Sequence, residues 1–537
     1  MASVLAVTGA GGGGSPAAAS ANLLNGPSAV VGLHAYLSHP ELAPAALRSR
    51  FWQARQAAAH AGSGTAAGPR GRGGVFNGDT VGLPQNEEAV SSCGPGARTV
   101  IGGTNDYRFL LDPQGNSTGW YFSADGGRTL ANEGLLPALR SPGGSSGSTV
   151  LPSGGDPVDV AGTGCGHLYA ASLNYDFTKP FPYPSGVGVY RTTPGTLAHC
   201  PQGRSDGGMT HPSCWPTRRL VDFAAPGRFL DKEWMAVGRS GAAGEVVWIA
   251  YGDLGDFNAE GNEESGVIKA VRCTADLSSC TRPIVLSQGQ KVAEYPWVTI
   301  GPDGRTYITW GQFFGDSFIG PAQRAWIAVA QPGSTTFTRH PIYRENQVMR
   351  GHEVLHAADF RTGTMFKNTV AMVHGHPRVF TTWERCQLHA LDQVCEEPQI
   401  VLTHSDDFGA TWSPRRVISA GGDNYFPFIA ADRRTGAIEE AWYTNRFDPI
   451  FHNRQDVELA RLSPAGAVLR RTRVTRISNE TEADPILGGA FIGDYFQIDA
   501  NHGKVYIHYN ANLRHVPLVG QGVPIPQQDN YLAVRGE

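Results

Sequence analysis

The stretch WVTIGPDGRTYITW, residues 297–310, contains two runs of alternating apolar and polar residues on either side of a Pro-Asp-Gly turn. Two such runs joined by a tight turn are typical of antiparallel strands that bury one face. A degraded form of the phrase recurs at intervals of roughly 60 residues, a period typical of stacked repeats. The other copies occupy residues 158–172, 234–251, 426–442 and 496–509.

When the copies are aligned, an aromatic residue falls at the same place in the second strand of several units. These residues are Tyr251, Trp310, Trp383, Trp442 and Tyr509. Aromatic rings bury large areas, so one ring at one position in successive units predicts a packing contact between neighbouring sheets. The pattern therefore predicts a radial array of small sheets, which is a β-propeller.

The phrases indicate about seven units, of which the first is weak. We place their starts near Glu87, Asp156, Asp231, Glu294, Glu353, Asn424 and Asp494. Only one further strand, around residues 530–534, follows the last phrase, so we expect a segment before Glu87 to complete the closing blade and cover its edge. The expected fold class is all-β: a six- or seven-bladed β-propeller, with seven favoured, preceded by a short N-terminal helical extension.

The composition fits a turn-rich chain and excludes several functional classes. The chain has 537 residues, with 68 Gly and 36 Pro, and only 17% of its residues are charged, which suits a core of several sheets. No stretch approaches the roughly 20 apolar residues that a membrane helix needs. The net charge of -4 is too small and too evenly spread to predict a nucleic-acid or anionic-membrane partner. We expect a monomer without a membrane span.

The region before the propeller divides into two segments. Residues 1–30 are apolar and Gly-rich and contain an Ala-Ser-Ala triplet ending at Ala21, but no basic region precedes it, so they form either a leader or a disordered segment. Within residues 31–86, Ser38 and Glu41 form a capping box for a helix, and a flexible Gly-rich linker begins at Gly62. The propeller is expected over residues 87–537.

The eight cysteines occur at positions that suit disulfide bonds. Three pairs close local loops, and the other two cysteines are left to pair between blades. The local pairs are Cys200 with Cys214, Cys273 with Cys280 and Cys386 with Cys395, and the last pair is Cys93 with Cys165. No spacing is the C-x2-C of a zinc site, which favours disulfides over reduced or metal-bound cysteines. We therefore expect a secreted or extracytoplasmic protein.

Two segments, SADGGRTL at residues 123–130 and SDDFGATW at residues 405–412, share the pattern S-x-D-x-G-x-T-(W/L). We expect a tight hairpin in each, whose Asp accepts hydrogen bonds from the turn backbone and whose Gly adopts a conformation that other residues avoid. The residues are Asp125 and Gly127 in the first segment and Asp407 and Gly409 in the second. This is the pattern of the Asp-box, or bacterial neuraminidase (BNR) repeat. Together with the propeller phrases, it makes residues 87–537 resemble the sialidase-like superfamily.

The resemblance implies a fold and only part of a reaction. Asp boxes lie in the outer turns of blades in sialidases, glycan lyases, xyloglucan hydrolases and sortilin-type receptors, where they do no chemistry. A sialidase carries an early Arg-Ile-Pro motif, three arginines for the substrate carboxylate, a Tyr nucleophile with a Glu partner, and an Asp acid/base. This chain has no Arg-Ile-Pro, and its nearest early segment is Tyr107, Arg108 and Phe109.

The residues just before each innermost strand are expected to converge on one pocket, because these strands begin at the wider face of the central funnel. They are Asp156, Asp231, Lys232, Glu233, Glu294, Tyr295, Arg350, His352, Glu353, Asp423, Asn424, Tyr425, Asp494 and Tyr495. Nearly every unit offers a carboxylate there, and tyrosine faces suit pyranose stacking. Crowded carboxylates raise one another's pKa, so that one can serve as a general acid while its neighbour stays ionised.

Part of this set suits a glycosidase. We expect Glu294 with Tyr495 to act as base and nucleophile, and Asp231 or Asp494 to act as the proton donor. The candidate substrate-binding residues are Arg350 and Arg446 as carboxylate anchors, with His352, Glu353, Tyr295 and Tyr425. The competing interpretation is that each acid only caps its strand by binding backbone amides. No metal or cofactor is expected.

The sequence HEVLHAADF, residues 352–360, contains H-E-x-x-H, which binds zinc in metalloproteases when both histidines share one face of a helix. Here the motif enters a repeat phrase and is expected to be a strand, on which His352 and His356 would lie about 13 Å apart. We therefore expect no zinc protease. His374 and His376 are expected in a hairpin turn.

The favoured interpretation is an exported carbohydrate-active propeller that resembles exo-sialidases and hydrolyses or binds glycans at its funnel. Two alternatives stay open: a catalytically silent propeller that binds glycan or protein, and a polysaccharide lyase with a His or Tyr base. An enzyme needs an arginine cluster or a close pair of acids in the funnel, whereas a binding protein needs only stacking faces.

Overall fold

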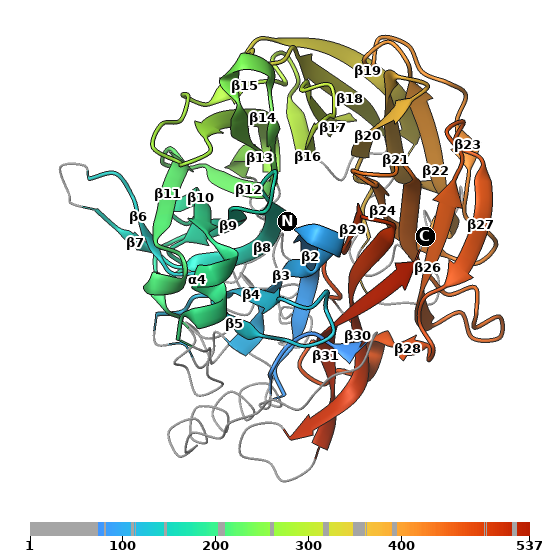
Figure 1. The fold of residues 1–537 in the computed structure, drawn as a ribbon, viewed down its shortest axis with the longest axis horizontal. Helices are drawn as coiled ribbons and strands as arrows, with labels where there is room; N and C mark the ends of the chain where they lie inside the picture. Colours follow the sequence, from blue (N-terminus) through green and yellow to red (C-terminus); the bar gives the residue numbers. More distant parts are fainter. Residues whose placement is uncertain are drawn as a thin grey trace, which may run out of the picture.

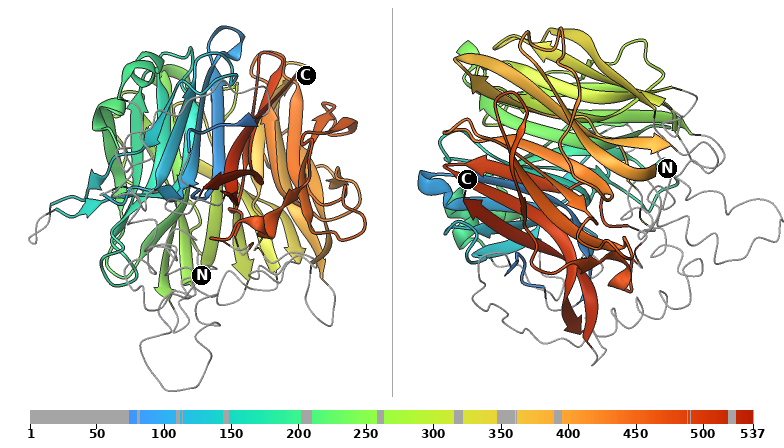
Figure 2. Two further views of the ribbon diagram at one scale, coloured as in Figure 1. Left: turned by 90° about the horizontal axis from the view of Figure 1, so that it is seen from below. Right: turned by 90° about the vertical axis from the view of Figure 1, so that its right-hand side faces the viewer.

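The computed structural model shows an all-β fold in which small sheets stand around a common centre (Figure 1). Figure 2 shows the sheets from two further sides, with their strands running across the thickness of the disc. The described residues are 74–79, 82–108, 112, 114–143, 148–201, 210–257, 263–314, 322–346, 360, 362–388, 395–487, 489, 491–517 and 524–536. This is the β-propeller arrangement that the repeated phrases predicted. The predicted leader and N-terminal helix lie outside the described residues.

The first two sheets are antiparallel, and in each the strand nearest the centre comes first in the chain (Figure 1). The first sheet contains β2 (Gln85–Cys93), β3 (Thr99–Asp106), β4 (Thr118–Ser123) and β5 (Asn132–Leu135). The second contains β8 (Ser153–Ala161), β9 (Leu168–Tyr175), β10 (Ser185–Thr192) and β11 (Thr217–Phe223). Between them in the chain, β6 (Leu139–Arg140) pairs with β7 (Val150–Leu151).

The next two repeats form one 8-stranded sheet. Its first part contains β12 (Phe229–Arg239), β13 (Glu245–Phe257), β14 (Glu263–Thr274) and β15 (Ile284–Val285). Its second part contains β16 (Val292–Ile300), β17 (Thr306–Phe314), β18 (Ala322–Ala330) and β19 (Phe337–Asn346). A single parallel pair, Gly266 with Val292, joins the two parts. The propeller arrangement is therefore present, whereas the number of blades stays a prediction.

Three further sheets complete the ring. One contains β20 (Lys367–Val373), β21 (His376–Leu388), β22 (Cys395–Ser405) and β23 (Arg416–Val417). The next contains β24 (Asn424–Ala431), β25 (Ile438–Thr444), β26 (Arg454–Leu462), β27 (Val468–Arg473) and β28 (Asn479–Glu480). The closing sheet contains β29 (Gln497–Asn501), β30 (Lys504–Pro517), β31 (Pro524–Gly536) and β1 (Gly74–Val75).

The closing sheet joins the two ends of the described chain. β1 pairs antiparallel with β31, with Gly74 opposite Leu532 and Val75 opposite Tyr531. The amide of Phe76 extends the pairing by donating to the carbonyl of Asn530 at 2.9 Å. The expectation that a segment before Glu87 completes the last unit is confirmed. The pairing covers an edge of β31 that would otherwise be open to other chains.

The predicted aromatic column is present. Its rings lie in the second strand of five repeats, and all are buried: Tyr251 in β13, Trp310 in β17, Trp383 in β21, Trp442 in β25 and Tyr509 in β30. Trp310 Nε1 donates to Gln290 Oε1 at 2.8 Å, and Trp442 Nε1 donates to Asn424 Oδ1 at 3.0 Å. The indole N–H of each of these two buried rings is thus satisfied by a side chain of its own repeat.

The start predicted near Glu353 was wrong for its repeat. The first strand of that sheet is β20, which pairs with β21 from Lys367 to Val373. Residues 347–359, with the H-E-x-x-H motif, lie outside the described residues. His374 and Gly375 form the turn between β20 and β21 with φ angles of 50° and 82°. The hairpin turn predicted around these histidines is confirmed.

Three of the four predicted cysteine pairs form disulfide bonds. They are Cys93–Cys165, Cys200–Cys214 and Cys273–Cys280. The first bond connects β2 of the first sheet to the turn between β8 and β9 of the second, as expected for a pair between blades. The side chains of Cys386 and Cys395 lie outside the described part of the chain.

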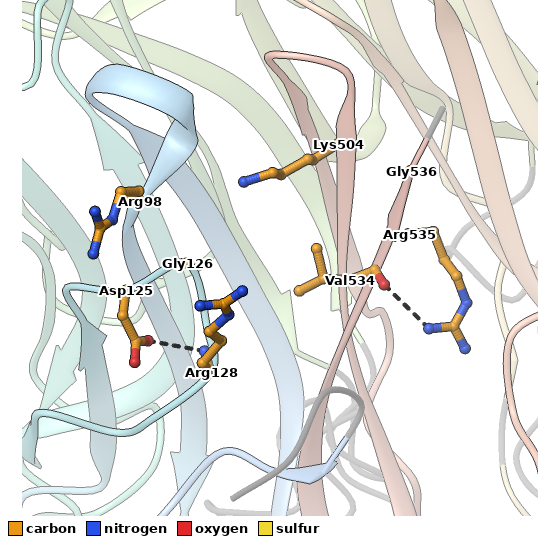
Figure 3. A pocket seen from close by; sticks show the side chains of 8 residues that line it. All are labelled: Arg98, Asp125, Gly126, Arg128, Lys504, Val534, Arg535 and Gly536. Carbon is orange, nitrogen blue, oxygen red and sulfur yellow. Dashed lines mark hydrogen bonds between the residues drawn. The ribbon is translucent and has the colours of Figure 1, made fainter.

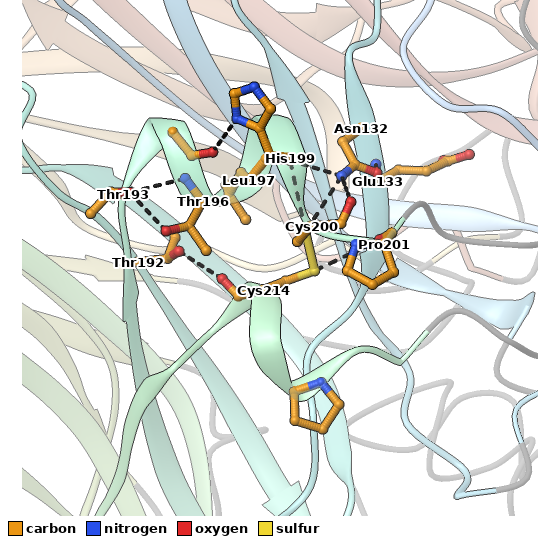
Figure 4. The surroundings of a disulfide bond; sticks show 12 residues. Asn132, Glu133, Thr192, Thr193, Thr196, Leu197, His199, Cys200, Pro201 and Cys214 are labelled. Carbon is orange, nitrogen blue, oxygen red and sulfur yellow. Dashed lines mark hydrogen bonds between the residues drawn. A yellow bond between two sulfur atoms is a disulfide. The ribbon is translucent and has the colours of Figure 1, made fainter.

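The Cys200–Cys214 bond fixes the connection between β10 and β11 (Figure 4). It joins the end of helix α4 (Pro194–His199) to a 3-10 helix, Pro212–Cys214. Asn132 of β5 donates its side-chain amide to the carbonyl oxygens of Leu197 at 2.7 Å and of Cys200 at 3.2 Å. The connection is therefore bound to the first sheet as well. No helix in the described ranges is long and apolar enough to cross a membrane.

Candidate functional site

A β-bulge recurs near the start of the innermost strands. In β2, β8, β12, β16 and β24, the pairing with the next strand skips two residues. The first skipped residue has a positive φ, which non-glycine residues rarely adopt. These residues are Glu87 (58°), Asp156 (52°), Lys232 (52°), Tyr295 (57°) and Phe426 (52°). Because a bulge breaks the in-and-out alternation of a strand and re-aims its side chains, it places polar groups at the centre of the ring.

Side chains from four inner segments meet at the Nζ atom of Lys232. This atom lies 2.6 Å from Oδ2 of Asp494, 2.9 Å from Oδ2 of Asp156 and 3.6 Å from Oε1 of Glu87. The amide of Asp494 also donates to Oε1 of Glu87 at 3.1 Å. All four side chains are buried, so their charges interact more strongly than they would in water.

Burial and charge set the protonation states in this cluster. Burial lowers the pKa of Lys232, but the three carboxylates around it outweigh burial and hold that pKa well above its ordinary value. Burial, followed by repulsion from Asp156, raises the pKa of Glu87 well above its ordinary value. The same two causes raise the pKa of the neighbouring Glu233. Burial and repulsion between the acids therefore favour the protonated forms of Glu87 and Glu233, while the surrounding acids favour the charged form of Lys232.

A narrow pocket lies beside the cluster. Its lining residues are Asp156, Lys232, Glu233, Trp234, Tyr295, Pro296, Trp297, Met365 and Tyr495. The rings of Trp234 and Trp297 stack with centroids 3.3 Å apart, and Tyr495 meets Trp234 edge-on at 5.5 Å. The side-chain oxygens of Glu233 accept no hydrogen bond from another described residue. The enclosed volume is about 10 Å³, which is space for about one water molecule.

A second buried lysine lies behind the aromatic wall of this pocket. Lys367 Nζ is 5.2 Å from the ring centroid of Trp297 and 5.5 Å from that of Phe428. It makes no hydrogen bond with any described residue. Burial lowers the pKa of Lys367 to about 7, against the attraction of Glu384 and other carboxylates. This lysine therefore exchanges its proton near neutral pH.

The predicted catalytic residues occupy different places around this cluster. Asp494 contacts Lys232, and Tyr495 lines the pocket while its hydroxyl donates to the carbonyl of Pro157 at 3.1 Å. Asp231 binds the backbone of the cluster, since its Oδ1 accepts the amide of Lys232 at 2.9 Å. Glu294 does not line the pocket and lies against β13 instead. A Cβ placed on Gly252 of that strand would be 3.6 Å from Cγ of Glu294.

Of the predicted substrate-binding residues, Tyr295 lines the pocket, whereas Tyr425 and Arg446 do not. The hydroxyl of Tyr425 bonds to Gln455 Oε1 at 3.1 Å. Arg446 pairs with Glu458 at 3.0 Å and lies over the ring of Phe447. The other three predicted residues, Arg350, His352 and Glu353, lie outside the described residues.

Lys232, Glu233 and Asp156 lie at predicted strand starts, but their sequence positions alone suggested no role for them. The sequence did contain a signal, because Lys232 is the only lysine in a set of strand starts that is rich in carboxylates. A lysine surrounded by acids is expected to become their common partner once the ring closes. No group of His, Cys, Asp or Glu side chains in the described ranges has an arrangement that could hold a metal ion.

The two turns with the S-x-D-x-G-x-T pattern lie away from this pocket, between the third and fourth strands of their sheets. Asp125 Oδ1 accepts the amides of Arg128 at 2.9 Å and Thr129 at 3.0 Å. Asp407 Oδ1 accepts the amide of Thr411 at 2.8 Å. The glycines at 127 and 409 have φ angles of 77° and 90°. The turn geometry expected from the sequence is confirmed, and these aspartates take no part in the pocket.

No protein-family model and no curated protein matches the chain. Among solved structures, it is similar to the Hadza microbial sialidase Hz136, at 11% identity and a TM-score of 0.41, over 71% of this chain and 65% of that one. It is also similar to phage phi92 endosialidase, at 10% identity and a TM-score of 0.44, over 87% and 69%. A third is an alpha-L-arabinanase of Penicillium chrysogenum, at 9% identity and a TM-score of 0.35, over 59% and 95%. The chain thus spans 65% of the length of sialidase Hz136, and these similarities assign it no activity.

Proposed function

We propose that the chain is a carbohydrate-active β-propeller that engages glycans over the pocket beside Lys232 and hydrolyses a glycosidic bond there. One observation carries the proposal: Glu233, a carboxyl group whose pKa is raised by burial, lines the same pocket as Asp156, which Lys232 contacts at 2.9 Å. Acid-assisted glycoside cleavage needs a proton-donating carboxyl group beside a second carboxyl group in a different environment. The pocket has space for about one water, so the sugar ring is proposed to lie over its opening, against the tryptophan walls.

The proposed roles differ in part from those expected from the sequence. Glu233 is the proton donor, because burial raises its pKa well above the ordinary value. Asp494, expected as a donor, is instead the ion-pair partner of Lys232, whose Nζ lies 2.6 Å away. Tyr495 remains the proposed nucleophile or proton relay. Burial raises its pKa well above the ordinary value, so a neighbouring carboxylate has to accept its proton first.

The remaining predicted residues are proposed to position other groups or to contact the sugar. Asp231 is a positioning residue for Lys232, whose amide it accepts. Tyr295 supplies a stacking face in the pocket, and Arg350 and His352 are proposed contacts for an acidic sugar. A planar guanidinium such as that of Arg350 matches a carboxylate bidentately.

The number of blades, the Asp boxes and export from the cell are part of the same proposal. We count seven blades, because one residue pair joins the two parts of the 8-stranded sheet, and each part has its own inner strand. The turns at Asp125 and Asp407 are proposed to be Asp boxes of a sialidase-like chain. The three disulfides support an exported protein, because such bonds persist in oxidising compartments.

A specific observation also favours a second candidate, a catalytically silent binding propeller. Lys232 pairs with carboxylates from three other inner segments, as a purely structural brace would do. The enclosed volume of about 10 Å³ points in the same direction. In this alternative, Glu233 is a buried carboxylic acid without a catalytic task, and glycans bind at the aromatic rim without being cleaved.

The two candidates are separated by the release of sugar from sialosides and uronic-acid polysaccharides. We expect the wild type to release sugar and Glu233→Gln to lose at least about 100-fold in kcat, because a positioned general acid contributes that much or more. Glu88→Gln is the matched control. Glu88 occupies the second bulge position of β2, as Glu233 does in β12, and burial raises its pKa as well, but it does not line the pocket.

Each outcome favours one candidate. Loss of release in Glu233→Gln with retention in Glu88→Gln supports hydrolysis. If the wild type releases nothing but retains glycans on an array, the silent binding propeller is the better account. If both variants fall equally, the two buried acids act through folding and not through the reaction.

A further inference from the structure

A second pocket lies at the seam between the first sheet and the closing sheet, away from Lys232. Its lining residues are Arg98, Asp125, Gly126, Arg128, Lys504, Val534, Arg535 and Gly536, and its volume is about 420 Å³. Arg98 follows the turn between β2 and β3, and Lys504 begins β30 after the turn that follows β29. The pocket therefore lies where the inner strands end, whereas Lys232 lies where its inner strand begins.

Four of the lining side chains are cationic, and none of them has a carboxylate partner among the described residues. Arg98 and Arg128 make no side-chain hydrogen bond or ion pair there. Lys504 Nζ donates only to the carbonyl of Gly96, at 2.8 Å. In a chain with a net charge of -4, a concave site with unpaired cations creates a local positive field that attracts anions.

Three of the cations border one space between the two sheets. In Figure 3, Arg128 and Lys504 extend into this gap from opposite sides, whereas the guanidinium group of Arg98 points away from Lys504. Arg535 turns the other way, and its Nη2 donates to the carbonyl of Val474 at 2.5 Å. The amide of Gly126 donates to the carbonyl of Arg98 at 2.6 Å, which holds the two arginine-bearing turns together.

The one acid in the pocket is already engaged by its own turn. Asp125 Oδ1 accepts the amides of Arg128 and Thr129, and Oδ2 accepts the hydroxyl of Thr129 at 2.8 Å. Burial alone would raise the pKa of Asp125, but these hydrogen bonds outweigh it and hold that pKa below its ordinary value. Its charge therefore offsets part of the positive field, while its oxygens bind the turn and make no ion pair with the guanidinium groups.

We propose that this seam pocket, defined by Arg98, Arg128 and Lys504, binds a small oxyanion, such as a sulfate, a phosphate or the carboxylate of an acidic sugar. Guanidinium groups bind such groups bidentately through charge-assisted hydrogen bonds. The lining contains no aromatic ring, so it offers nucleobases no stacking surface. The cations form a single pocket and not a stripe, which also argues against a nucleic-acid strand.

The position of the pocket gives the bound anion a structural consequence. Arg128 belongs to the first sheet and Lys504 to the closing sheet, so an anion held by both would bridge the seam at which the ring closes. A ligand that binds only the folded chain stabilises it in proportion to the logarithm of its concentration. Oxyanion binding is therefore expected to raise the melting temperature of this propeller in a saturable way.

The test is a calorimetric titration at constant ionic strength with inorganic sulfate, inorganic phosphate, glucuronate and neutral glucose. We expect saturable binding of at least one anion, no binding of glucose, and at least a tenfold weaker affinity in Arg128→Gln and in Lys504→Gln, since each loses a charge-assisted contact. Tight binding of an inorganic ion identifies a free ion as the ligand, whereas preference for glucuronate identifies an acidic sugar.

Arg416→Gln is the matched control, because Arg416 of β23 is exposed and also has no carboxylate partner among the described residues. This substitution removes the same charge at a residue that does not line the seam pocket. The affinity of the variant for the anions is expected to equal that of the wild type. Circular dichroism and melting without ligand check that each variant folds. The proposal is overturned if no anion binds saturably to the wild type, or if Arg416→Gln weakens binding as much as Arg128→Gln does.

Discussion

The ammonium group of Lys232 lies 2.6 Å from the carboxylate of Asp494, a residue 262 positions further along the chain. Lys232 belongs to the bulge of β12, and Asp494 lies three residues before β29, the inner strand of the closing sheet. The same ammonium contacts Asp156 and Glu87, which belong to the first two sheets. One side chain thus connects widely separated parts of the ring and sets the charge of the candidate site.

Replacing Lys232 by Met is expected to lower the free energy of unfolding by about 3–5 kcal/mol, because it leaves buried carboxylates without their partner. Urea denaturation measures the loss. The comparison is Lys269→Met, since Lys269 pairs with Asp253 at 2.5 Å but its side chain is 22% exposed. That change is expected to cost no more than about 1 kcal/mol, as for other partly solvated pairs. Equal losses in the two variants would contradict the role of Lys232 as the central brace.

The second buried lysine predicts a pH dependence. The pKa of Lys367 is lowered to about 7 in the folded chain from an ordinary value of 10.5. Between these values the unfolded chain holds a proton that the folded chain has released, so stability rises with pH across this window. We expect this rise to be smaller in Lys367→Met, measured by urea denaturation from pH 7 to pH 10.

The control is Lys179→Met, because Lys179 is exposed. This variant loses the same charge and measures the background slope of stability against pH. Two neighbouring acids, Glu384 and Glu440, have pKa values that burial raises to about 8. They reduce stability as pH rises from 4.5 to 8, which is the opposite sign, so the comparison is cleanest above pH 8. An unchanged slope in Lys367→Met above pH 8 would show that this lysine is already charged in the fold.

The disulfides are expected to differ in their contribution to stability. Cys93–Cys165 closes 72 residues, whereas Cys273–Cys280 closes 7. Cross-linking a longer loop removes more entropy from the unfolded chain, so the double Ser variants are expected to lose about 4 and about 2 kcal/mol respectively. Chemical denaturation under oxidising conditions measures both losses. The reverse order would show that strain or residual structure, and not loop length, dominates.

Much of the fold could be predicted because short local sequence patterns specify its hairpins. Alternating runs around a turn predict hairpins, and the aromatic column and the closure by a segment before Glu87 follow from the repeat. The strand start predicted near Glu353 was wrong for a physical reason. The phrase HEVLHAADF has strand-like alternation, whereas the true inner strand, β20, begins at Lys367 with a polar Lys-Asn-Thr start. A short apolar run cannot show which of two neighbouring segments pairs with β21.

The candidate site was predictable only to the level of the strand starts. The sequence places Asp231, Lys232 and Glu233 together but does not reveal the bulge between them. Since a bulge interrupts the period of two, it decides which of three adjacent side chains points to the axis. The same shift separates Glu294, which lies against β13, from Tyr295, which lines the pocket. The pairing of Lys232 with Asp494 needs ring closure, which no local pattern encodes.

The catalytic role proposed for Tyr495 predicts a loss of turnover without a loss of fold. In Tyr495→Phe the ring still packs against Trp234, and only the hydroxyl that donates to Pro157 at 3.1 Å is removed. Losing one such hydrogen bond costs about 1 kcal/mol of stability. A nucleophile or proton relay contributes at least about 100-fold to kcat, so kcat on the best glycan is expected to fall that far while KM changes little.

The matched control is Tyr190→Phe. Tyr190 of β10 is also buried, and its hydroxyl donates to another backbone carbonyl, that of Pro137, at 2.9 Å. It does not line the pocket beside Lys232. The hydroxyl of Tyr190 also accepts Nδ2 of Asn174 at 3.0 Å, so Tyr190→Phe is expected to lose at least as much stability as Tyr495→Phe, and only Tyr495→Phe is expected to lose turnover. If both retain full kcat, the hydroxyl of Tyr495 only anchors its ring to the strand that carries Asp156, and a carboxylate of the Lys232 cluster has to be the nucleophile.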